Sequence, residues 1–242
     1  MGTHIFYTAG ETAALHRAVT QLQNAGLTFS AEPGNHITHL LLPVPSLSPD
    51  GTIRGGGNFH QLLQMLPEDV CIIGGNLPPM PQHKIIDLLT DPVYVAENAY
   101  ITAHCAVRLM MEELPTSLRD CKILVIGWGR IGKCLASLLQ RMEANVTVAA
   151  RKEADRAILQ ALGYHAILPG ETGDFRVIFN TVPAPVPCDC TPDCLKIDLA
   201  STQGISCADV IHATGLPGKD APEASGNLIA RTVLQLLKEE CL

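Results

Sequence analysis

Hydrophobic positions along this chain alternate between two periods. Short apolar runs typical of buried strands are followed by segments in which apolar residues recur every three or four positions, as on one face of a helix. We expect strands at 4–9, 38–44, 69–75, 92–96, 122–127, 145–151, 164–170, 176–182, 194–200 and 208–214. We expect helices at 11–26, 58–66, 82–89, 102–115, 130–143, 153–163 and 221–240. Strands that alternate with helices predict an α/β fold with parallel sheets covered by helices.

The pattern lengthens after residues 97–101, which suggests a domain boundary. A length of 242 residues, at roughly 150 residues per domain, allows between one and two domains. We therefore expect a small α/β domain on the substrate side over 1–97. Residues 98–242 would form a doubly wound parallel-sheet Rossmann domain.

Composition excludes several classes of protein. The chain carries 17 lysines and arginines against 24 aspartates and glutamates, a net charge of −7. A nucleic-acid-binding protein needs clustered positive charge, so that class is excluded. Hydrophobic residues make up 47% of the chain, enough for a sizeable core. No apolar run approaches the roughly 18–20 residues of a membrane-spanning helix.

Cysteine usage and the first residues bear on the compartment. The opening residues, MGTHIFYTAG, lack the basic and apolar regions of a secretory signal. Nine cysteines, an odd number, are spread along the chain. We expect reduced thiols in a cytoplasmic protein.

The sharpest motif is Gly127-Trp128-Gly129-Arg130-Ile131-Gly132, which follows one predicted strand and opens a helix. In that context GxGxxG predicts a dinucleotide site. Gly127 would permit the tight turn, Gly129 would let a pyrophosphate approach the backbone, and Gly132 would let the helix pack closely on the sheet. The phosphates would lie on free N–H groups at the positive end of the helix. The alternative is a glycine turn without a ligand.

The end of the second strand of this unit indicates which dinucleotide binds. Ala150 lies where NAD-binding proteins usually carry an acid for the ribose 2′-hydroxyl, and Arg151 and Lys152 follow. An arginine can bind a 2′-phosphate, so we expect NADP as the cofactor. The alternative is that Arg151 and Lys152 only end the strand on its solvent side.

Other segments end strands of the same predicted sheet, and ligands lie beyond the carboxyl ends of such strands. These segments contain further candidate cofactor-binding residues, Thr181, Val182, Pro183, Ala200, Ser201, Gly215, Leu216 and Pro217. We expect 181–183 and 200–201 to border the nicotinamide half. Asp198 is polar inside an apolar strand, and we interpret it as a core carboxylate with satisfied hydrogen bonds.

Several segments carry a family resemblance. They are the stretch 98–132, VTVAARKEADRA, FNTVPA, IDLAS, GLPGKDAPEASG and, in the first domain, LLPVPS. On these segments the chain resembles dipicolinate synthase A, most clearly over 98–230. The resemblance implies an architecture similar to that of D-2-hydroxyacid dehydrogenases, with a small domain facing a Rossmann domain across a cleft.

The same resemblance implies an activity. A dihydropyridine dicarboxylate would be oxidised to pyridine-2,6-dicarboxylate, with NADP+ taking the hydride, and a second dipicolinate synthase subunit would take part in spore-forming bacteria. We also expect a homo-oligomer. Where members of the family tend to carry Glu, this chain has His104.

Candidate catalytic and substrate-binding residues follow from the chemistry of such a reaction. His104 suits acid/base work because a histidine exchanges protons near neutral pH; the alternative is a helix-face histidine with a structural hydrogen bond. Lys219 is the second catalytic candidate, near the nicotinamide. A dicarboxylate substrate would need positive charge and donors. We expect these from Arg54 and Lys219, with hydroxyl donors from Ser46 and Thr102. Asn98 is a further candidate for substrate binding.

Cys188, Cys190 and Cys194 form a CxCxxxC pattern in a proline-rich loop. Zinc sites usually show paired CxxC units or a nearby histidine ligand, so we expect free thiols and no metal. Two other functions remain open. One is an NADP-dependent dehydrogenase of 2-hydroxy or 2-imino acids, and the other is a non-catalytic NADP-binding subunit or sensor.

Overall fold

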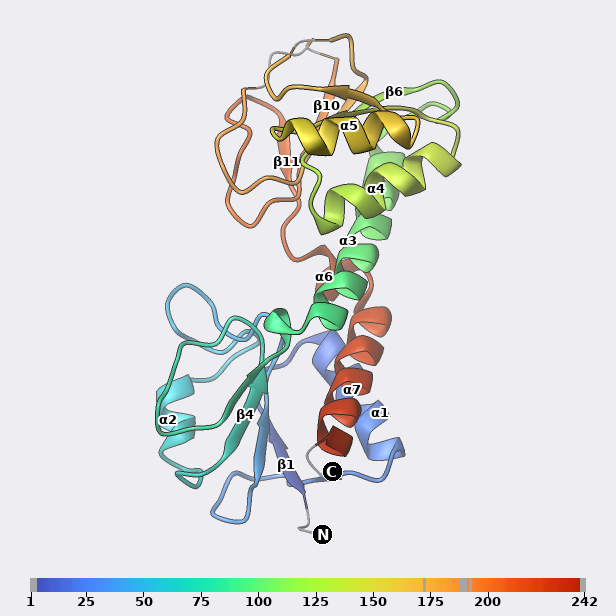
Figure 1. The fold of residues 1–242 in the computed structure, drawn as a ribbon. Helices are drawn as coiled ribbons and strands as arrows, with labels where there is room; N and C mark the ends of the chain where they lie inside the picture. Colours follow the sequence, from blue (N-terminus) through green and yellow to red (C-terminus); the bar gives the residue numbers. More distant parts are fainter. Residues whose placement is uncertain (1–3, 172, 188–190, 192, 240–242) are drawn as a thin grey trace. The chain divides into compact units, whose positions relative to one another are not determined.

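The computed structural model describes residues 4–171, 173–187, 191 and 193–239 (Figure 1). The chain forms two compact units. The first comprises Met1–Asn98 and Pro217–Leu242, and the second comprises Ala99–Leu216. Among the described residues, no helix combines the length and apolar character needed to cross a membrane.

The first unit is built on a parallel sheet in the order β2-β1-β3-β4-β5. The strands are β1 (Ile5–Thr8), β2 (Thr28–Phe29), β3 (His39–Leu41), β4 (Cys71–Gly74) and β5 (Ile85–Asp87). This is one of the two common doubly wound orders. Helix α2 (Phe59–Leu63) is capped by Asn58, whose side chain accepts a hydrogen bond from the Gln61 amide. The helix buries Phe59 in a cluster with Leu40 and Ile72.

The second unit contains a parallel sheet in the order β11-β10-β9-β6-β7-β8. The strands are β6 (Lys122–Ile126), β7 (Asn145–Ala149), β8 (His165–Ile167), β9 (Val177–Asn180), β10 (Leu195–Asp198) and β11 (Val210–His212). When β6 to β11 are numbered 1 to 6 along the chain, their order across the sheet, read from the β8 edge, is 3-2-1-4-5-6. This is the strand order of a Rossmann fold, and the direction of the order reverses between the neighbouring strands β6 and β9. Helices α4 (Arg130–Arg141) and α5 (Glu153–Ala161) follow β6 and β7. The predicted α/β fold class is confirmed.

The C-terminal helix α7 (Pro222–Glu239) belongs to the first unit, so our assignment of 217–242 to the Rossmann domain is wrong. It packs against α1 (Ala13–Asn24), as Figure 1 shows. Gly226 permits the close approach, because a Cβ there would lie 2.5 Å from the Ala14 carbonyl oxygen. Arg17 of α1 adds a hydrogen bond to Asn227 (3.0 Å) and an ion pair with Glu223 (2.9 Å). Periodicity predicts an amphipathic helix but not the surface that covers it.

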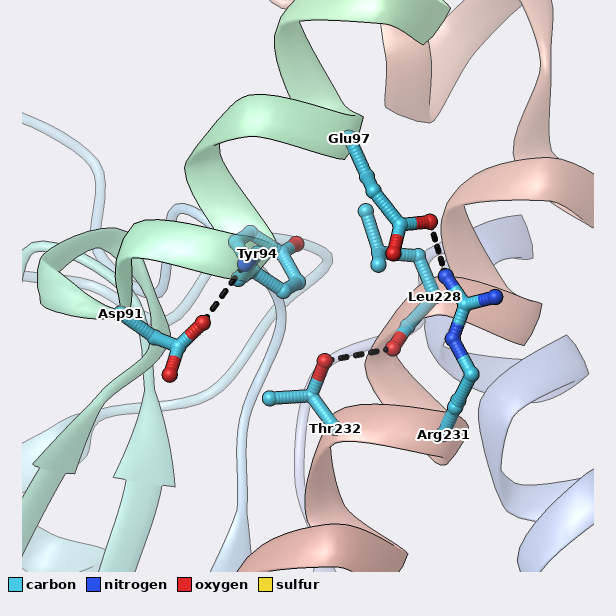
Figure 2. Close-up of polar contacts among 6 residues, drawn as sticks. All are labelled: Asp91, Tyr94, Glu97, Leu228, Arg231 and Thr232. Atoms are coloured by element: carbon cyan, nitrogen blue, oxygen red, sulfur yellow. Dashed lines mark hydrogen bonds and ion pairs between the residues drawn. The ribbon is translucent and has the colours of Figure 1, made fainter.

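The strand expected at 92–96 is also wrong, because these residues begin helix α3 (Pro92–Glu113). Asp91 accepts a hydrogen bond from the Tyr94 amide at 2.6 Å, and Pro92 occupies the first helical position, which tolerates proline well. Glu97 of α3 pairs with Arg231 of α7 (Figure 2). The capped start and its contact with α7 override the strand preference of the residues VYV. The division between the two units falls within α3, after Asn98.

The helix expected at 82–89 is replaced by strand β5 and a 3-10 helix, η1 (Leu88–Thr90). Ile85 and Ile86 pair with Ile72 and Ile73 of β4, so sheet pairing wins over the helical pattern. Asp87 then ends the strand, because its carboxylate accepts from the amides of Leu77 and Leu89. A short apolar run cannot by itself decide between helix and strand.

Candidate dinucleotide-binding site

The glycine motif forms a tight turn between β6 and α4. Gly127 has φ +107°, and a Cβ there would collide with the side chains of Thr181 and Val182. A Cβ on Gly132 would overlap the carbonyl oxygen of Gly127. Gly129 differs from both, since a Cβ there would meet no atom within 4 Å. Two glycines therefore serve the fold, and the third faces open space.

A pocket of about 370 Å³ opens beside this turn. Predicted cofactor residues contribute much of its lining, namely Gly127, Trp128, Gly129, Arg151, Lys152, Thr181, Val182 and Pro183. The pocket lies where the β6 turn, the end of β7 and the loop after β9 meet. Ligands of doubly wound sheets bind at this carboxyl edge, near the reversal of strand order.

Two polar side chains fix the loops beyond β9 and β10. Asn180 donates to Asp198 at 3.0 Å and, through its side chain, bonds both the amide and the carbonyl of Val182. Asp198 also accepts from the amides of Ala200, Gly204 and Ile205 at 2.8–3.0 Å. Asp198 is 1% exposed, so the interpretation as a satisfied core carboxylate is confirmed. Thr181 donates its hydroxyl to the Ile126 carbonyl, which ties the β9 loop to the glycine turn.

The turn after β7 carries the charge of the pocket. Arg151 and Lys152 are exposed, and Ala150, in the place of the usual acid, is 3% exposed. Arg156 donates to the carbonyls of Ala150 and Arg151 at 2.8 and 2.7 Å, which fixes the backbone of this turn. Asp155, in the first turn of α5, lines the pocket as well.

Trp128, the only tryptophan of the chain, lies in the glycine turn and lines the pocket. Its ring meets Tyr164 edge to face, with 5.8 Å between centroids. The Lys133 ammonium lies 5.7 Å from the Trp128 centroid. Burial raises the pKa of the Tyr164 phenol, and the charge of Arg141 acts in the opposite direction.

Several predicted cofactor residues are not among those that line this pocket. Arg130, Ile131 and Gly132 form the first turn of α4 behind the glycine loop. Ala200 is buried, with its amide bonded to the Asp198 carboxylate, and Ser201 is exposed. Gly215 ends the last loop of the second unit with φ +70°. Leu216 is buried at the start of α6 (Leu216–Asp220), and Pro217 is assigned to the first unit.

The catalytic candidates lie on helices. His104 is exposed on α3, and its ring meets that of Tyr100 edge to face at a centroid distance of 4.4 Å. Lys219 is on α6, where it is exposed to solvent. Thr102 is 7% exposed on α3, and Asn98 is half-buried on the same helix. Their catalytic and substrate-binding roles stay predictions.

The two candidates in the first unit differ sharply. Ser46 is fully buried, and its hydroxyl donates to the Pro43 carbonyl at 2.8 Å and accepts from the Gly75 amide at 2.9 Å. With its hydrogen already used, this hydroxyl cannot donate to a substrate, so the predicted role of Ser46 is wrong. Arg54 is exposed, with one nitrogen donating to the Leu47 carbonyl at 3.2 Å.

Sequence reasoning missed part of the pocket wall. The missed residues are Asp155, Pro169, Ala184, Pro185, Val186 and Pro187. The proline-rich composition of 183–187 marks a loop but does not show its place beside the pocket. That place depends on contacts such as the hydrogen bond from the Val186 amide to the Gly204 carbonyl. Of the candidate thiols, Cys188 and Cys190 lie outside the described residues, and Cys194 is buried.

The residues present fit a nicotinamide dinucleotide. Gly129 leaves room at the start of α4 for a pyrophosphate, and no side chain caps this helix end. The buried wall of Ile126, Ala149 and Ala150 suits an adenosine group. Such a site on a Rossmann sheet, joined to a second doubly wound unit, defines an NAD(P)-dependent oxidoreductase-like fold. A D-isomer-specific 2-hydroxyacid dehydrogenase from Xanthobacter autotrophicus Py2 shares it, with a TM-score of 0.52, 13% identity and coverage of 99% of this chain and 97% of that one.

One particular protein is similar in sequence as well. Dipicolinate synthase A of Bacillus subtilis (strain 168) is 25% identical over 240 aligned positions, and the match covers 86% of this chain and 80% of that protein. The crystal structure of dipicolinate synthase A from Bacillus halodurans has a TM-score of 0.83 at 19% identity and covers 98% of both chains. No family model matches the chain. The predicted resemblance to dipicolinate synthase A is confirmed.

Proposed function

We propose that this protein is an NADP-dependent oxidoreductase that acts on a dihydropyridine dicarboxylate, as its resemblance to dipicolinate synthase A implies. The observation that carries the proposal is the pocket beside Gly129, with Arg151 and Lys152 at one wall. The sequence similarity to dipicolinate synthase A supports the substrate class.

The residues that follow β7 support NADP over NAD as the bound cofactor. Ala150 is buried and offers no carboxylate to a ribose hydroxyl, whereas Arg151 and Lys152 offer two cations. Neither of these two side chains forms a hydrogen bond or ion pair with any other described residue. A guanidinium matches a phosphate with two parallel hydrogen bonds, so Arg151 is the better candidate for the 2′-phosphate.

In the proposed reaction the substrate ring loses a hydride and a proton and becomes aromatic. The bound nicotinamide would supply the hydride acceptor. The chain must then hold two carboxylates and take up the proton. Arg54 is the candidate for a carboxylate, because its guanidinium is exposed on a loop whose backbone is fixed at Ser46. His104 would accept the proton, and the positive charge of Lys219 would help to hold the second carboxylate.

Calorimetry with both reduced cofactors tests the first half of the proposal. NADPH should bind more tightly than NADH, and Arg151→Ala should weaken NADPH by roughly ten- to a hundredfold while leaving NADH nearly unchanged. Equal affinities, or tighter NADH, would contradict the assignment of NADP.

Absorbance at the nicotinamide band tests the second half. Dihydrodipicolinate with NADP+ should produce NADPH. Turnover of 2-hydroxy or 2-imino acids alone would indicate a different dehydrogenase. Tight cofactor binding without turnover of any of these substrates would indicate a binding subunit or sensor.

A further inference from the structure

Asp155 is the only acidic side chain that lines the dinucleotide pocket in the described part of the chain. It lies in the first turn of α5 and is half-buried, whereas Glu153 in the same turn is exposed and does not line the pocket. The Asp155 carboxylate forms no hydrogen bond or ion pair with any described residue. A negatively charged side chain in the first turn of a helix interacts favourably with the helix dipole.

Its place in the pocket identifies the part of the ligand that it would meet. The glycine turn at Gly127–Gly129 marks the pyrophosphate, and the end of β7 marks the ribose of the adenosine half. Asp155 lines the same pocket as Arg151 and Lys152. Arg156, the next residue, fixes the backbone between them by its bonds to the Ala150 and Arg151 carbonyls. The carboxylate therefore follows the two cations closely along the chain, and the backbone of the turn that carries them is fixed by hydrogen bonds.

We propose that Asp155 is a specificity-determining residue that accepts a hydrogen bond from the adenosine ribose of a dinucleotide lacking the 2′-phosphate. The inference rests on the proposed dinucleotide function of the pocket. An acid at this point attracts a ribose hydroxyl and repels a 2′-phosphate, and the two cations do the reverse. Because specificity is a difference between two affinities, Asp155 limits the preference that Arg151 and Lys152 create. The acidic residue of this site thus lies in the first turn of the helix after β7, whereas NAD-binding proteins usually carry it at the end of the strand. With this arrangement the pocket accepts both cofactors.

The test is calorimetry of NADH and NADPH on the full chain and on two matched variants. Asp155→Asn removes the charge inside the pocket, and Glu153→Gln removes one charge from the same helical turn outside it. In Asp155→Asn, NADH should bind about tenfold more weakly and NADPH more tightly, because the amide oxygen accepts a weaker hydrogen bond than the carboxylate and does not repel a phosphate. Glu153→Gln should leave the ratio of the two affinities unchanged. Asp155→Ala serves if the asparagine variant has a lowered melting temperature, since alanine has the strongest helix propensity.

The adenosine fragments 5′-AMP and 2′,5′-ADP locate the effect. The same change in ratio with the fragments supports contact at the ribose. A change with the whole dinucleotides but not with the fragments would overturn the proposal, as would an equal shift in Glu153→Gln. If the unmodified chain binds both cofactors and Asp155→Asn leaves their ratio unaltered, only the role of Asp155 is refuted. If the unmodified chain binds neither, the proposed function fails with it.

Discussion

The Asn180 side chain donates to the Asp198 carboxylate at 3.0 Å, and this bond joins the ends of two neighbouring strands under the cofactor pocket. Asn180 shapes the start of the β9 loop, and Asp198 gathers three backbone amides from the β10 loop. The glycine turn is tied to the same arrangement through Thr181. The pocket wall is thus fixed by buried hydrogen bonds and does not depend on its own exposed side chains.

Replacing Asp198 by alanine should destabilise the second unit strongly. The Asn180 amide and three backbone N–H groups would lose their acceptor in a site that water does not reach, and each unpaired buried donor costs about 1–3 kcal/mol. We expect a loss of at least about 3 kcal/mol of unfolding free energy, measured by denaturant titration. Ser201→Ala, at an exposed position of the same loop, is the control and should change little. A small effect of Asp198→Ala would show that the network is dispensable.

Gly129→Val should abolish dinucleotide binding without unfolding the protein. The position has φ −79° and ψ −170°, which valine adopts readily, and a Cβ there meets no protein atom within 4 Å. The added side chain would instead fill the space proposed for the pyrophosphate. Thermal melting with and without NADPH measures both properties. A variant still stabilised by NADPH would place the cofactor elsewhere.

Gly132→Val is the matched contrast. Its Cβ would overlap the Gly127 carbonyl oxygen, so this change should lower the melting temperature even in the absence of ligand. The pair of variants separates a glycine needed for binding from one needed for folding.

Trp128 should report ligand binding by its fluorescence. It is the only tryptophan, it lines the pocket, and its ring is flanked by Tyr164 and Lys133. Titration with NADP+ should change its emission along a saturable curve that matches the calorimetric affinity. Trp128→Phe should lose the signal and still bind in the calorimeter. An emission that does not respond while calorimetry shows binding would place the ligand away from this ring.

His104→Ala should lower turnover by about a hundredfold or more, the usual effect of removing a general acid or base. NADPH affinity should not change, because His104 does not line the dinucleotide pocket. Arg108→Ala removes another exposed side chain one turn further along α3 and serves as the control for damage to the helix. Unchanged turnover in His104→Ala would leave this residue with a structural role.

The sequence was most informative where chemistry and local geometry coincide. The glycine motif, the strand it follows and the cations after β7 could all be placed from spacing, because each depends on contacts within a few residues. The place of Asp155 in the pocket could not be predicted in this way. The acidic residue of a dinucleotide site is expected at the end of the strand, and Asp155 reaches the pocket from the first turn of α5. The predicted role of Ser46 is wrong because it depends on a contact that is distant in sequence. Its hydroxyl is used by Gly75, a partner distant in sequence whose position depends on the pairing of β3 with β4.

The first turns of α3 illustrate the same limit. The residues VYV favour a strand. The neighbouring sequence does not predict that Glu97 pairs with Arg231, which lies on a helix more than a hundred residues later. The cap at Asp91 was the local signal available, in the pattern of an acid followed by proline. Local preference decides such a segment only when no tertiary partner competes.

Tyr94, also in these first turns, should make the stability of the protein fall in alkaline solution. Burial raises the pKa of its phenol in the folded protein, whereas an unfolded tyrosine titrates near pH 10. Above that pH the unfolded state loses its proton while the folded state keeps it, so unfolding becomes more favourable as pH rises. Its contribution should approach about 1.4 kcal/mol per pH unit above pH 10. Comparing Tyr94→Phe with the unmodified protein by denaturant titration from pH 9 to pH 11 isolates this residue, because Tyr164 and the other titrating groups are common to both. The unmodified protein should lose stability more steeply, and parallel curves would show that the Tyr94 phenol ionises equally well in the folded state.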